Sequence, residues 1–190
     1  MNLHSSMNKV LSGLFILLTA ACQQEQPQRM NDVQVLGSHN SYKLDLDPAL
    51  KAMLEEQRPG SWQGLEYGHL SLTEQLDHGL RKLELDVVYD PQGGMYANPV
   101  GYTQLKQNGM PVSDFDPDGL MDQPGFKVLH VPDIDFRTHC YTFIECLEEV
   151  KAWSDTNPDH YPIAIMMNAK DGGVGLPGFT EPLKFDAAAF

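Results

Sequence analysis

The sequence has few basic residues, and no stretch of the chain concentrates them. Lysine and arginine number 13 against 26 aspartates and glutamates, which gives a formal net charge of −13. Binding of nucleic acid depends on clustered lysine and arginine side chains that neutralise phosphates, so this composition excludes a nucleic-acid partner. The acidic surface favours solubility and repels anionic ligands, which would have to be held locally, for example by a bound cation.

The sequence also lacks an apolar run of the roughly 20 residues that a permanent membrane span requires. A shorter apolar run extends from Val10 to Leu18, after the single positive side chain of Lys9. This pattern predicts a cleaved export signal, a signal peptide, over residues 1–22. The polar residues 23–30 then form a tether to the folded domain.

Cysteine is scarce, with three residues in the chain. Small residues leading directly into Cys22 resemble a bacterial lipoprotein signal, which implies a lipid on Cys22 and attachment to a membrane surface of the bacterial cell envelope. An ordinary secreted protein, periplasmic or extracellular, is the alternative. Cys140 and Cys146 then remain as a pair in an oxidising compartment, where they form either a disulfide or two free buried thiols.

Residues 31–190 are long enough for one domain. Short apolar runs predict buried strands at residues 33–37, 83–88, 126–131 and 161–168. Helices between most of these strands, together with the apolar character of the strands, predict an α/β fold with a parallel sheet.

Three helices are predicted from amphipathic spacing and from capping residues. They cover residues 48–57, a segment from Ser71 or Thr73 to Gly79, and residues 142–154. Residues 90–124 form a long excursion without a periodic pattern, and loops of that length are often functional. A glycine-rich loop follows the fourth strand, and the last residues look like the start of another helix.

Polar and ionisable side chains recur where the predicted strands end. They are His39 and Asn40 after the first strand, Glu84 and Asp86 on the second, His130 on the third, and Asn168 and Lys170 at the fourth. In a parallel α/β barrel the carboxyl ends of the strands converge on one mouth, where active sites form. Any one of these features is more typical of a solvated surface, but their recurrence at four strands favours a shared site.

The chemistry that such a set can perform is narrow. Glu84 and Asp86 lie two residues apart on a strand and therefore face the same side, so they can bind one ion together. Carboxylate and amide oxygens suit a hard cation, Ca²⁺ or Mg²⁺, rather than zinc. Two histidines could then act as acid and base or stabilise the charge that develops at phosphorus. The residues therefore predict cleavage of a phosphodiester.

Several segments of the sequence resemble a known family. The segment Gly37-Ser38-His39-Asn40-Ser41-Tyr42 is similar to the motif that opens the catalytic barrel of Ca²⁺-dependent phosphoinositide phospholipases C. Residues 72–86, 127–130 and 162–165 are similar to later blocks of that family, in the same order and spacing. The likeness covers about residues 31–175 and is closest to the compact bacterial branch.

The resemblance implies a (β/α)8 TIM-barrel fold, of which residues 31–190 would form the N-terminal half with about the first four strands. It implies His39 and His130 as catalytic residues and Asn40, Glu84 and Asp86 as Ca²⁺ ligands. The family usually has a glutamate where this chain has Asn168, whose amide can still bind Ca²⁺ through oxygen but adds no charge. Lys170 would contact the substrate phosphate, with a solvated loop lysine as the alternative reading.

The implied reaction is cleavage of the glycerol–phosphate bond of phosphoinositides, in which the inositol 2-hydroxyl attacks phosphorus and expels diacylglycerol. One alternative is a glycerophosphodiester phosphodiesterase, which also uses a barrel with strand-end histidines, although its first block usually reads His-Arg-Gly. The other is an inactive truncated envelope lipoprotein, because a complete barrel of this kind typically needs about 250 residues.

Overall fold

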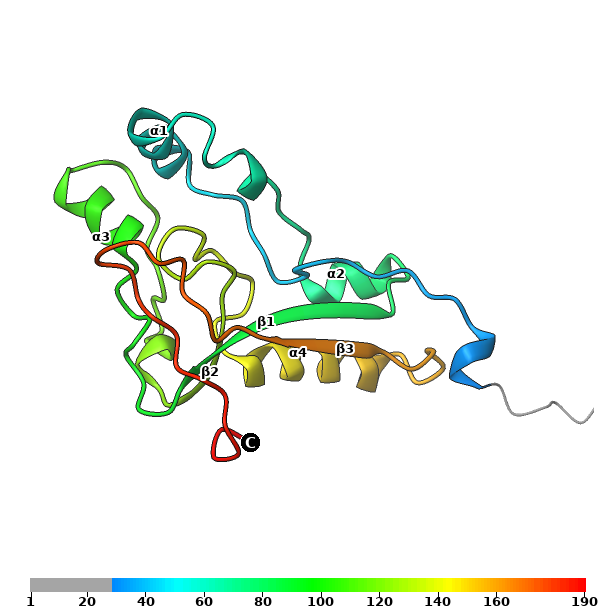
Figure 1. Cartoon of the computed structure of the whole chain (residues 1–190). Helices are drawn as coiled ribbons and strands as arrows, with labels where there is room; N and C mark the ends of the chain where they lie inside the picture. Colours follow the sequence, from blue (N-terminus) through cyan, green and yellow to red (C-terminus); the bar gives the residue numbers. More distant parts are fainter. Residues whose placement is uncertain (1–28) are drawn as a thin grey trace, which may run out of the picture. The chain divides into compact units, whose positions relative to one another are not determined.

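The computed structural model describes residues 29–190 (Figure 1). The predicted signal peptide over 1–22, the predicted lipidation site Cys22 and residues 23–28 of the predicted tether lie outside the described residues. The chain divides into two compact units, Met1–Gln34 and Val35–Phe190. In the first unit, the 3-10 helix η1 covers Met30–Asp32, and the backbone N–H of Arg29 donates to the Asp32 carboxylate at 3.1 Å.

The second unit has an α/β fold around a small mixed sheet, in the strand order β2-β1-β3. The strands are β1 (Lys82–Asp90), β2 (Gly125–Val128) and β3 (Ala164–Ala169). The helices are α1 (Pro48–Gln57), α2 (Leu72–Asp77), α3 (Val100–Gln107) and α4 (Phe143–Thr156), with the 3-10 turns η2 (Gln63–Leu65) and η3 (Leu120–Asp122). Within the described residues, no helix has the length and apolar character needed to cross a membrane.

The central strand β1 has two different faces, as its alternation predicts. Its first face packs in one apolar cluster with side chains of α2 and α4, and it consists of Leu83, Leu85 and Val87. The opposite face carries Glu84 and Asp86, which are also buried, and then Val88. Val88 belongs to a second apolar cluster, formed largely by side chains of α1, α3 and the loops beside them. Figure 1 shows α1 and α3 side by side, away from α2 and α4.

The strand β2 runs antiparallel to β1, so the prediction of a wholly parallel sheet is wrong. Only β3 pairs in parallel with β1. Asp90 at the end of β1 is the register partner of Gly125 at the start of β2, so the excursion between them begins and ends at the same end of the sheet. A parallel strand would need a connection that crosses back to the other end, and β2 therefore runs back along β1.

The predicted first strand at residues 33–37 is wrong, because only an isolated parallel bridge joins Gly37 to Lys82. The two backbones approach so closely there that a Cβ on Gly37 would lie 2.6 Å from the Cβ of Lys82. Three residues later, Asn40 adopts a left-handed conformation with φ of 51° and turns the chain out of the extended path. Leu36 is 73% exposed, so this apolar run does not mark a buried strand.

The fourth predicted strand, residues 161–168, is present as β3 but starts at Ala164 and is not heavily buried. Within the described sheet β3 pairs only with β1, so it forms an edge. Alternate side chains of β3 remain accessible as a result, and Met166 is 44% exposed. The helix expected near the end of the chain is also wrong, since residues 187–189 form a turn.

The excursion between β1 and β2 is more ordered than the sequence indicates, because it contains α3 and η3. Gly101 weakens the helical signal of α3. Its lack of a side chain allows close packing, since a Cβ there would lie 3.0 Å from both the Asp133 carbonyl oxygen and a Leu50 methyl group. Tertiary packing rather than local propensity therefore stabilises α3.

The three predicted helices are confirmed. The helix α1 has the predicted bounds, with Pro48 in its first turn. The helix α2 begins after Ser71, whose hydroxyl accepts from the backbone N–H of Glu74 at 3.2 Å while the Glu74 carboxylate accepts from the Ser71 N–H. Ser71 rather than Thr73 is therefore the cap, and α4 follows its predicted capping residue Thr142.

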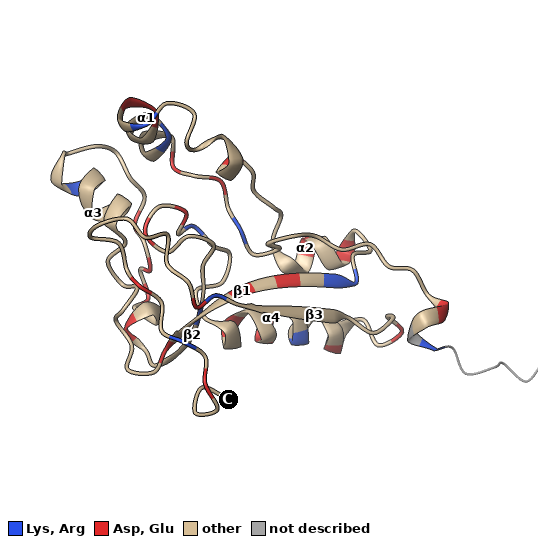
Figure 2. Ribbon diagram, in the orientation of Figure 1, with Lys and Arg blue, Asp and Glu red and all other residues tan. Residues whose placement is uncertain are grey.

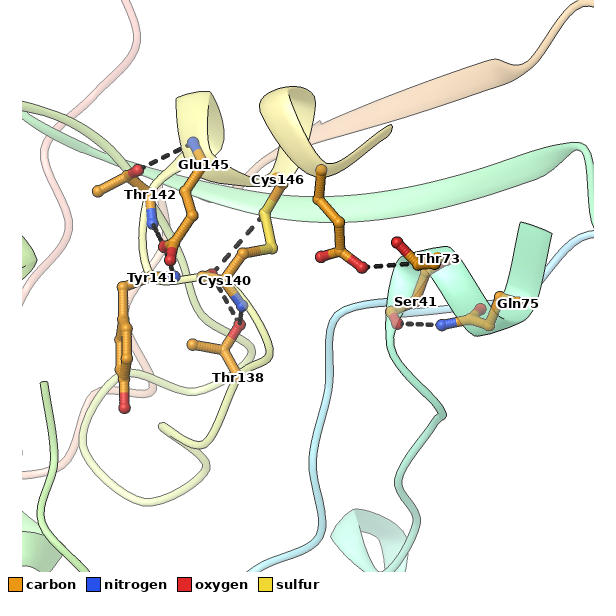
Figure 3. Close-up of a disulfide and its surroundings, with 10 residues drawn as sticks. Ser41, Thr73, Gln75, Thr138, Cys140, Tyr141, Thr142, Glu145 and Cys146 are labelled. Carbon is orange, nitrogen blue, oxygen red and sulfur yellow. Dashed lines mark hydrogen bonds between the residues drawn. A yellow bond between two sulfur atoms is a disulfide. The ribbon is translucent and has the colours of Figure 1, made fainter. Parts of the chain in front are cut away.

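Cys140 and Cys146 form a disulfide, so the prediction of a pair is confirmed and the alternative of two free thiols is wrong (Figure 3). The disulfide ties the chain before α4 to the first turn of this helix. At the same turn the Thr142 hydroxyl accepts from the backbone N–H of Glu145 at 3.1 Å, and the Glu145 carboxylate accepts from the Tyr141 N–H at 2.7 Å. The start of α4 is thus fixed by a covalent bond and by a capping box.

Replacing the capping threonine tests how much the capping box contributes to the stability of the protein in addition to the disulfide. Thr142→Ala should lower the free energy of unfolding by about 1 kcal/mol, because the first-turn N–H groups lose their acceptor. Urea denaturation of the oxidised protein measures the change. Thr156→Ala, in the last turn of the same helix, is the control, and equal effects of the two substitutions would show that the box contributes nothing specific.

Candidate active site

The loop after Gly37 carries His39 and Asn40 to the polar face of β1. The backbone N–H of Ser41 donates to the Glu84 carbonyl at 2.9 Å, and the Glu84 N–H donates to the Ser41 hydroxyl at 2.8 Å. These two hydrogen bonds fix the loop against the middle of β1. Asn40 directly precedes Ser41 and takes the left-handed conformation that asparagine tolerates better than most residues.

Tyr67, in the segment before α2, lies at the centre of the predicted catalytic residues. Its ring centroid is 6.5 Å from that of His39 and 6.5 Å from that of His130. The side-chain amide of Asn40 donates to the Tyr67 hydroxyl at 2.7 Å. The adjacent residues His39 and Asn40 and the distant His130 are therefore brought together around one phenol ring.

The Tyr67 hydroxyl holds its proton more strongly than that of a free tyrosine, partly because acidic residues surround it. Burial raises the pKa of Tyr67 above its ordinary value, and the hydrogen bond from Asn40 partly opposes this rise. The negative charges of Asp135, Asp86 and Glu84 raise the pKa of Tyr67 further. The Tyr67 hydroxyl therefore stays protonated at neutral pH. Direct contacts connect two of these carboxylates to the histidines, at 3.7 Å between Glu84 and His39 and 2.6 Å between Asp135 and His130.

Glu84 lies between two groups that can carry positive charge. The Lys82 ammonium lies 2.9 Å from one carboxylate oxygen, and the Nε2 of His39 lies 3.7 Å from the other. The Glu84 side chain is 8% exposed, whereas that of His39 is 71% exposed. The carboxylate is therefore held in the interior while the imidazole faces the solvent, from which a substrate would enter.

Asp86 is the more deeply buried carboxylate, and β3 supplies its partners. Asn168 is its register partner, and the Asn168 side-chain amide donates to Asp86 at 2.7 Å. The Lys170 ammonium lies 3.0 Å from the other carboxylate oxygen. Burial and then the charge of Asp86 raise the pKa of Tyr42, although the Tyr42 hydroxyl has no hydrogen-bond partner of acceptable geometry among the described residues.

The donor set on this face suits a hard cation. In the described part of the chain, histidine, cysteine, aspartate and glutamate side chains form no group of three that could hold a metal ion. The face instead combines two buried carboxylates with the amide oxygen of Asn40, which is buried without a hydrogen-bond partner among the described residues. An oxygen in that position is available to a cation, and all the donors on this face are of the type that Ca²⁺ prefers. The residues therefore fit Ca²⁺.

His130 is held by a buried carboxylate that follows it in the chain. Its Nδ1 lies 2.6 Å from the Asp135 carboxylate, which is fully buried, while the His130 side chain is 17% exposed. A hairpin-like loop brings the two together, since the backbone N–H of Asp135 donates to the Val131 carbonyl at 2.8 Å. Because an ionised carboxylate only accepts, the proton of this bond sits on Nδ1, and Nε2 remains free for a substrate.

Lys43 neutralises Asp135 from the other side. Its ammonium lies 3.2 Å from the carboxylate, and both side chains are completely buried. The same ammonium donates to the backbone carbonyls of Leu44, Leu65 and Tyr67. Lys43 thus links the loop that carries His39 to the segment that carries Tyr67 and to the partner of His130.

The histidines, the carboxylates and Asn40 were predicted from the sequence, whereas the residues that contact and hold them were not. Lys82 gives a readable signal, because it lies two residues before Glu84 and so on the same face of β1. Tyr67, Lys43 and Asp135 lie in loops without a periodic pattern, and only the tertiary structure brings them to the site. The ligand roles predicted for Asn40, Glu84, Asp86 and Asn168 stay predictions.

Comparison with known proteins gives one family. Residues 28–190 match the family model described as phosphoinositide phospholipase C, Ca²⁺-dependent. No curated protein and no solved structure matches the chain.

The buried pair of Lys43 and Asp135 should be essential for folding as well as for the site. Lys43→Met leaves a buried carboxylate without its counter-charge, so we expect the free energy of unfolding to fall by about 3–5 kcal/mol. Adding Asp135→Asn should restore part of this loss. Urea denaturation at neutral pH measures both.

The control for this experiment is Lys51→Met, which breaks the accessible pair of Lys51 with Glu66. An exposed pair contributes at most about 1 kcal/mol. If Lys43→Met were no more destabilising than Lys51→Met, the buried pair would not have the role assigned to it.

Proposed function

The chain belongs to the family of Ca²⁺-dependent phosphoinositide phospholipases C, and we propose that it cleaves the glycerol–phosphate bond of phosphoinositides. The observation that carries the proposal is the grouping of His39, Asn40 and His130 around Tyr67, with the Glu84 carboxylate of β1 3.7 Å from His39. Two imidazoles next to a cluster of hard oxygen ligands suit cleavage of a phosphodiester.

Four residues would hold the cation: Asn40, Glu84, Asp86 and Asn168. When bound, Ca²⁺ would lower the pKa of a hydroxyl that it contacts and would offset the charge of a phosphate. Asn168 presents its amide nitrogen to Asp86, and in this role the amide would turn to present its oxygen.

His130 is the proposed general acid. The Asp135 carboxylate at Nδ1 stabilises the imidazolium form of His130, whose Nε2–H can donate its proton to the glycerol oxygen as the bond between phosphorus and that oxygen breaks. Diacylglycerol then leaves as a neutral alcohol. Asp135 acts through His130 and is a positioning residue.

His39 and the carboxylates have the other two roles. The exposed imidazole of His39 would donate a hydrogen bond to the phosphoryl oxygen on which charge develops. The proton of the attacking inositol 2-hydroxyl passes to Glu84 or Asp86, because the amide of Asn168 cannot accept it. The product is an inositol cyclic phosphate, and Lys170 contributes positive charge for the substrate phosphate.

Family membership also leads us to place β1 and β3 in a (β/α)8 barrel. The support is their parallel pairing with α4 in the connection between them. Export and lipid attachment through Cys22 stay predictions of the sequence. Lipid attachment would place the enzyme beside a membrane, where a phospholipid substrate is present.

Hydrolysis of phosphatidylinositol in mixed vesicles with Ca²⁺ tests the proposal. His39→Ala and His130→Ala should each lower kcat/KM by about 10²–10⁴-fold, which is the usual contribution of an acid–base residue. A chelator should abolish the activity of the wild-type chain. His78→Ala, at the exposed end of α2, is the matched control and should retain full activity.

Two outcomes of this assay would go against the proposal. Full turnover of His39→Ala would remove His39 from the mechanism. A folded wild-type chain that releases neither diacylglycerol nor an inositol phosphate in the presence of Ca²⁺ would favour the inactive envelope lipoprotein instead.

The positioning role of Asp135 has its own test. Asp135→Asn can present an amide N–H to Nδ1, which favours the neutral Nε2–H tautomer of His130 and no longer stabilises the imidazolium that donates the proton, so we expect kcat to fall by about 10²-fold or more while KM changes little. ¹⁵N NMR of the imidazole should show the proton moving from Nδ1 to Nε2. An unchanged tautomer together with unchanged kcat would contradict the assignment.

A further inference from the structure

Both carboxylates on the polar face of β1 are paired with lysine ammonium groups. The Lys82 ammonium lies 2.9 Å from Glu84, and the Lys170 ammonium lies 3.0 Å from Asp86. The carboxylate side chains are 8% and 1% exposed, whereas the two lysine side chains are 31% and 32% exposed. Each pair therefore joins a buried anion to a cation that has a path to solvent. Figure 2 shows the acidic (red) and basic (blue) positions following one another along β1.

Other lysines of this domain are held differently. Lys43 is completely buried and donates to three backbone carbonyls besides its ion pair. Lys127 is also buried and donates to the carbonyls of Leu120 and Gln123. Lysines with several fixed acceptors in the interior cannot leave without a large loss of hydrogen bonding.

Lys82 and Lys170 lack such anchoring. Apart from Glu84, the Lys82 ammonium has one long contact, at 3.3 Å to the Ser38 carbonyl. The Lys170 ammonium donates to Asp86 alone among the described residues. A lysine side chain has a flexible four-carbon stem and a strongly hydrated head group, so these two ammonium groups can move to solvent.

We propose that Lys82 and Lys170 are exchangeable counter-ions: a divalent cation displaces their ammonium groups from Glu84 and Asp86, and the freed ammonium groups bind the phosphate of a phosphodiester. The inference rests on the proposed function, because it assigns the cation to this face of β1. The inference adds an anion-binding role for Lys82 and a coupling between the binding of the divalent cation and the binding of the phosphodiester.

The sum of charges on the polar face of β1 explains why cation binding would favour phosphodiester binding. Two carboxylates and two ammonium groups cancel, so the face is neutral as it stands. A divalent cation gives it a double positive charge, concentrated where the two lysines become free. The chain as a whole has a net charge of −13 and repels anionic ligands. The site therefore attracts a phosphodiester strongly only after the cation has bound.

Calorimetric titration with Ca²⁺ tests the displacement. In the full chain, Lys82→Met and Lys170→Met should each bind Ca²⁺ about tenfold more tightly than the wild type, because the competing ammonium is gone, and typical couplings between two bound groups are roughly 5–150-fold. Lys82→Gln and Lys170→Gln remove the charge but keep a polar side chain, and they should bind Ca²⁺ as tightly as the methionine variants. An equal gain in affinity would show that the lost charge, rather than the lost polar group, causes the effect.

The control is Lys151→Met, which removes the same charge from an exposed pair with Asp155 on α4. It accounts for the general effect of a more negative protein on cation binding. Its affinity for Ca²⁺ should stay within about twofold of the wild type, since a surface charge is largely screened. Circular dichroism of each variant confirms that the fold is retained.

The anion role is tested with dimethyl phosphate, the smallest phosphodiester, followed by ³¹P NMR with and without Ca²⁺. In the wild type, Ca²⁺ should tighten dimethyl phosphate binding, and by reciprocity dimethyl phosphate should tighten Ca²⁺ binding by the same factor. In Lys82→Met and Lys170→Met this mutual effect should shrink severalfold. In Lys151→Met it should be unchanged.

The outcomes separate the inference from the function on which it rests. If the wild type binds Ca²⁺ but the Lys82 and Lys170 variants bind it no more tightly than Lys151→Met, the displacement is wrong. If the mutual effect of Ca²⁺ and dimethyl phosphate survives in those variants, the anion role is wrong. If neither the wild type nor any variant binds Ca²⁺, the cation site itself and with it the proposed function are wrong.

Discussion

The burial of two carboxylates on one strand is the constraint on which the rest of the site depends. Glu84 and Asp86 lie on the face of β1 opposite the leucines of the main core, and both are almost inaccessible. A buried carboxylate is costly unless charges and hydrogen bonds surround it. The loop with His39, the edge strand β3 and two lysines meet that requirement, and in doing so they assemble the candidate active site.

The two histidines are positioned by different means. His39 lies on a loop locked to β1 by the reciprocal hydrogen bonds of Ser41 and is open to solvent. His130 is held from behind by the buried Asp135, which Lys43 neutralises. The His39 imidazole can therefore adjust its position to a bound substrate, whereas the His130 imidazole is held in one orientation by Asp135. This difference suits a stabilising role for His39 and proton donation by a fixed His130.

Local patterns in the sequence were sufficient for the parts of the fold that depend on them. Capping residues and amphipathic spacing predict α1, α2 and α4, and the alternation of β1 predicts which side chains enter the core. The direction of β2 could not be predicted, because it follows from where the excursion after Asp90 ends in space. The bridge at Gly37 replaces a strand because the turn at Asn40 interrupts pairing.

The residues of the candidate site also fall into those that local sequence patterns predict and those that only the tertiary structure reveals. His39, Asn40, Glu84, Asp86 and His130 could be named from the sequence because they lie on or just after apolar runs and within a family motif. Tyr67, Lys43 and Asp135 could not, since their positions depend on contacts between distant loops. The antiparallel β2 also brings His130 to the site by a route that the parallel-sheet argument did not foresee.

The central claim is that the polar face of β1 binds the cation that phosphodiester cleavage needs. Calorimetric titration of the full chain with Ca²⁺, beside the same titration of a Glu84→Gln, Asp86→Asn variant, tests it most directly. The account predicts binding in the wild type and loss of binding in the variant, with the amide side chains retaining the shape of the site. Equal Ca²⁺ affinity in the two proteins would contradict it.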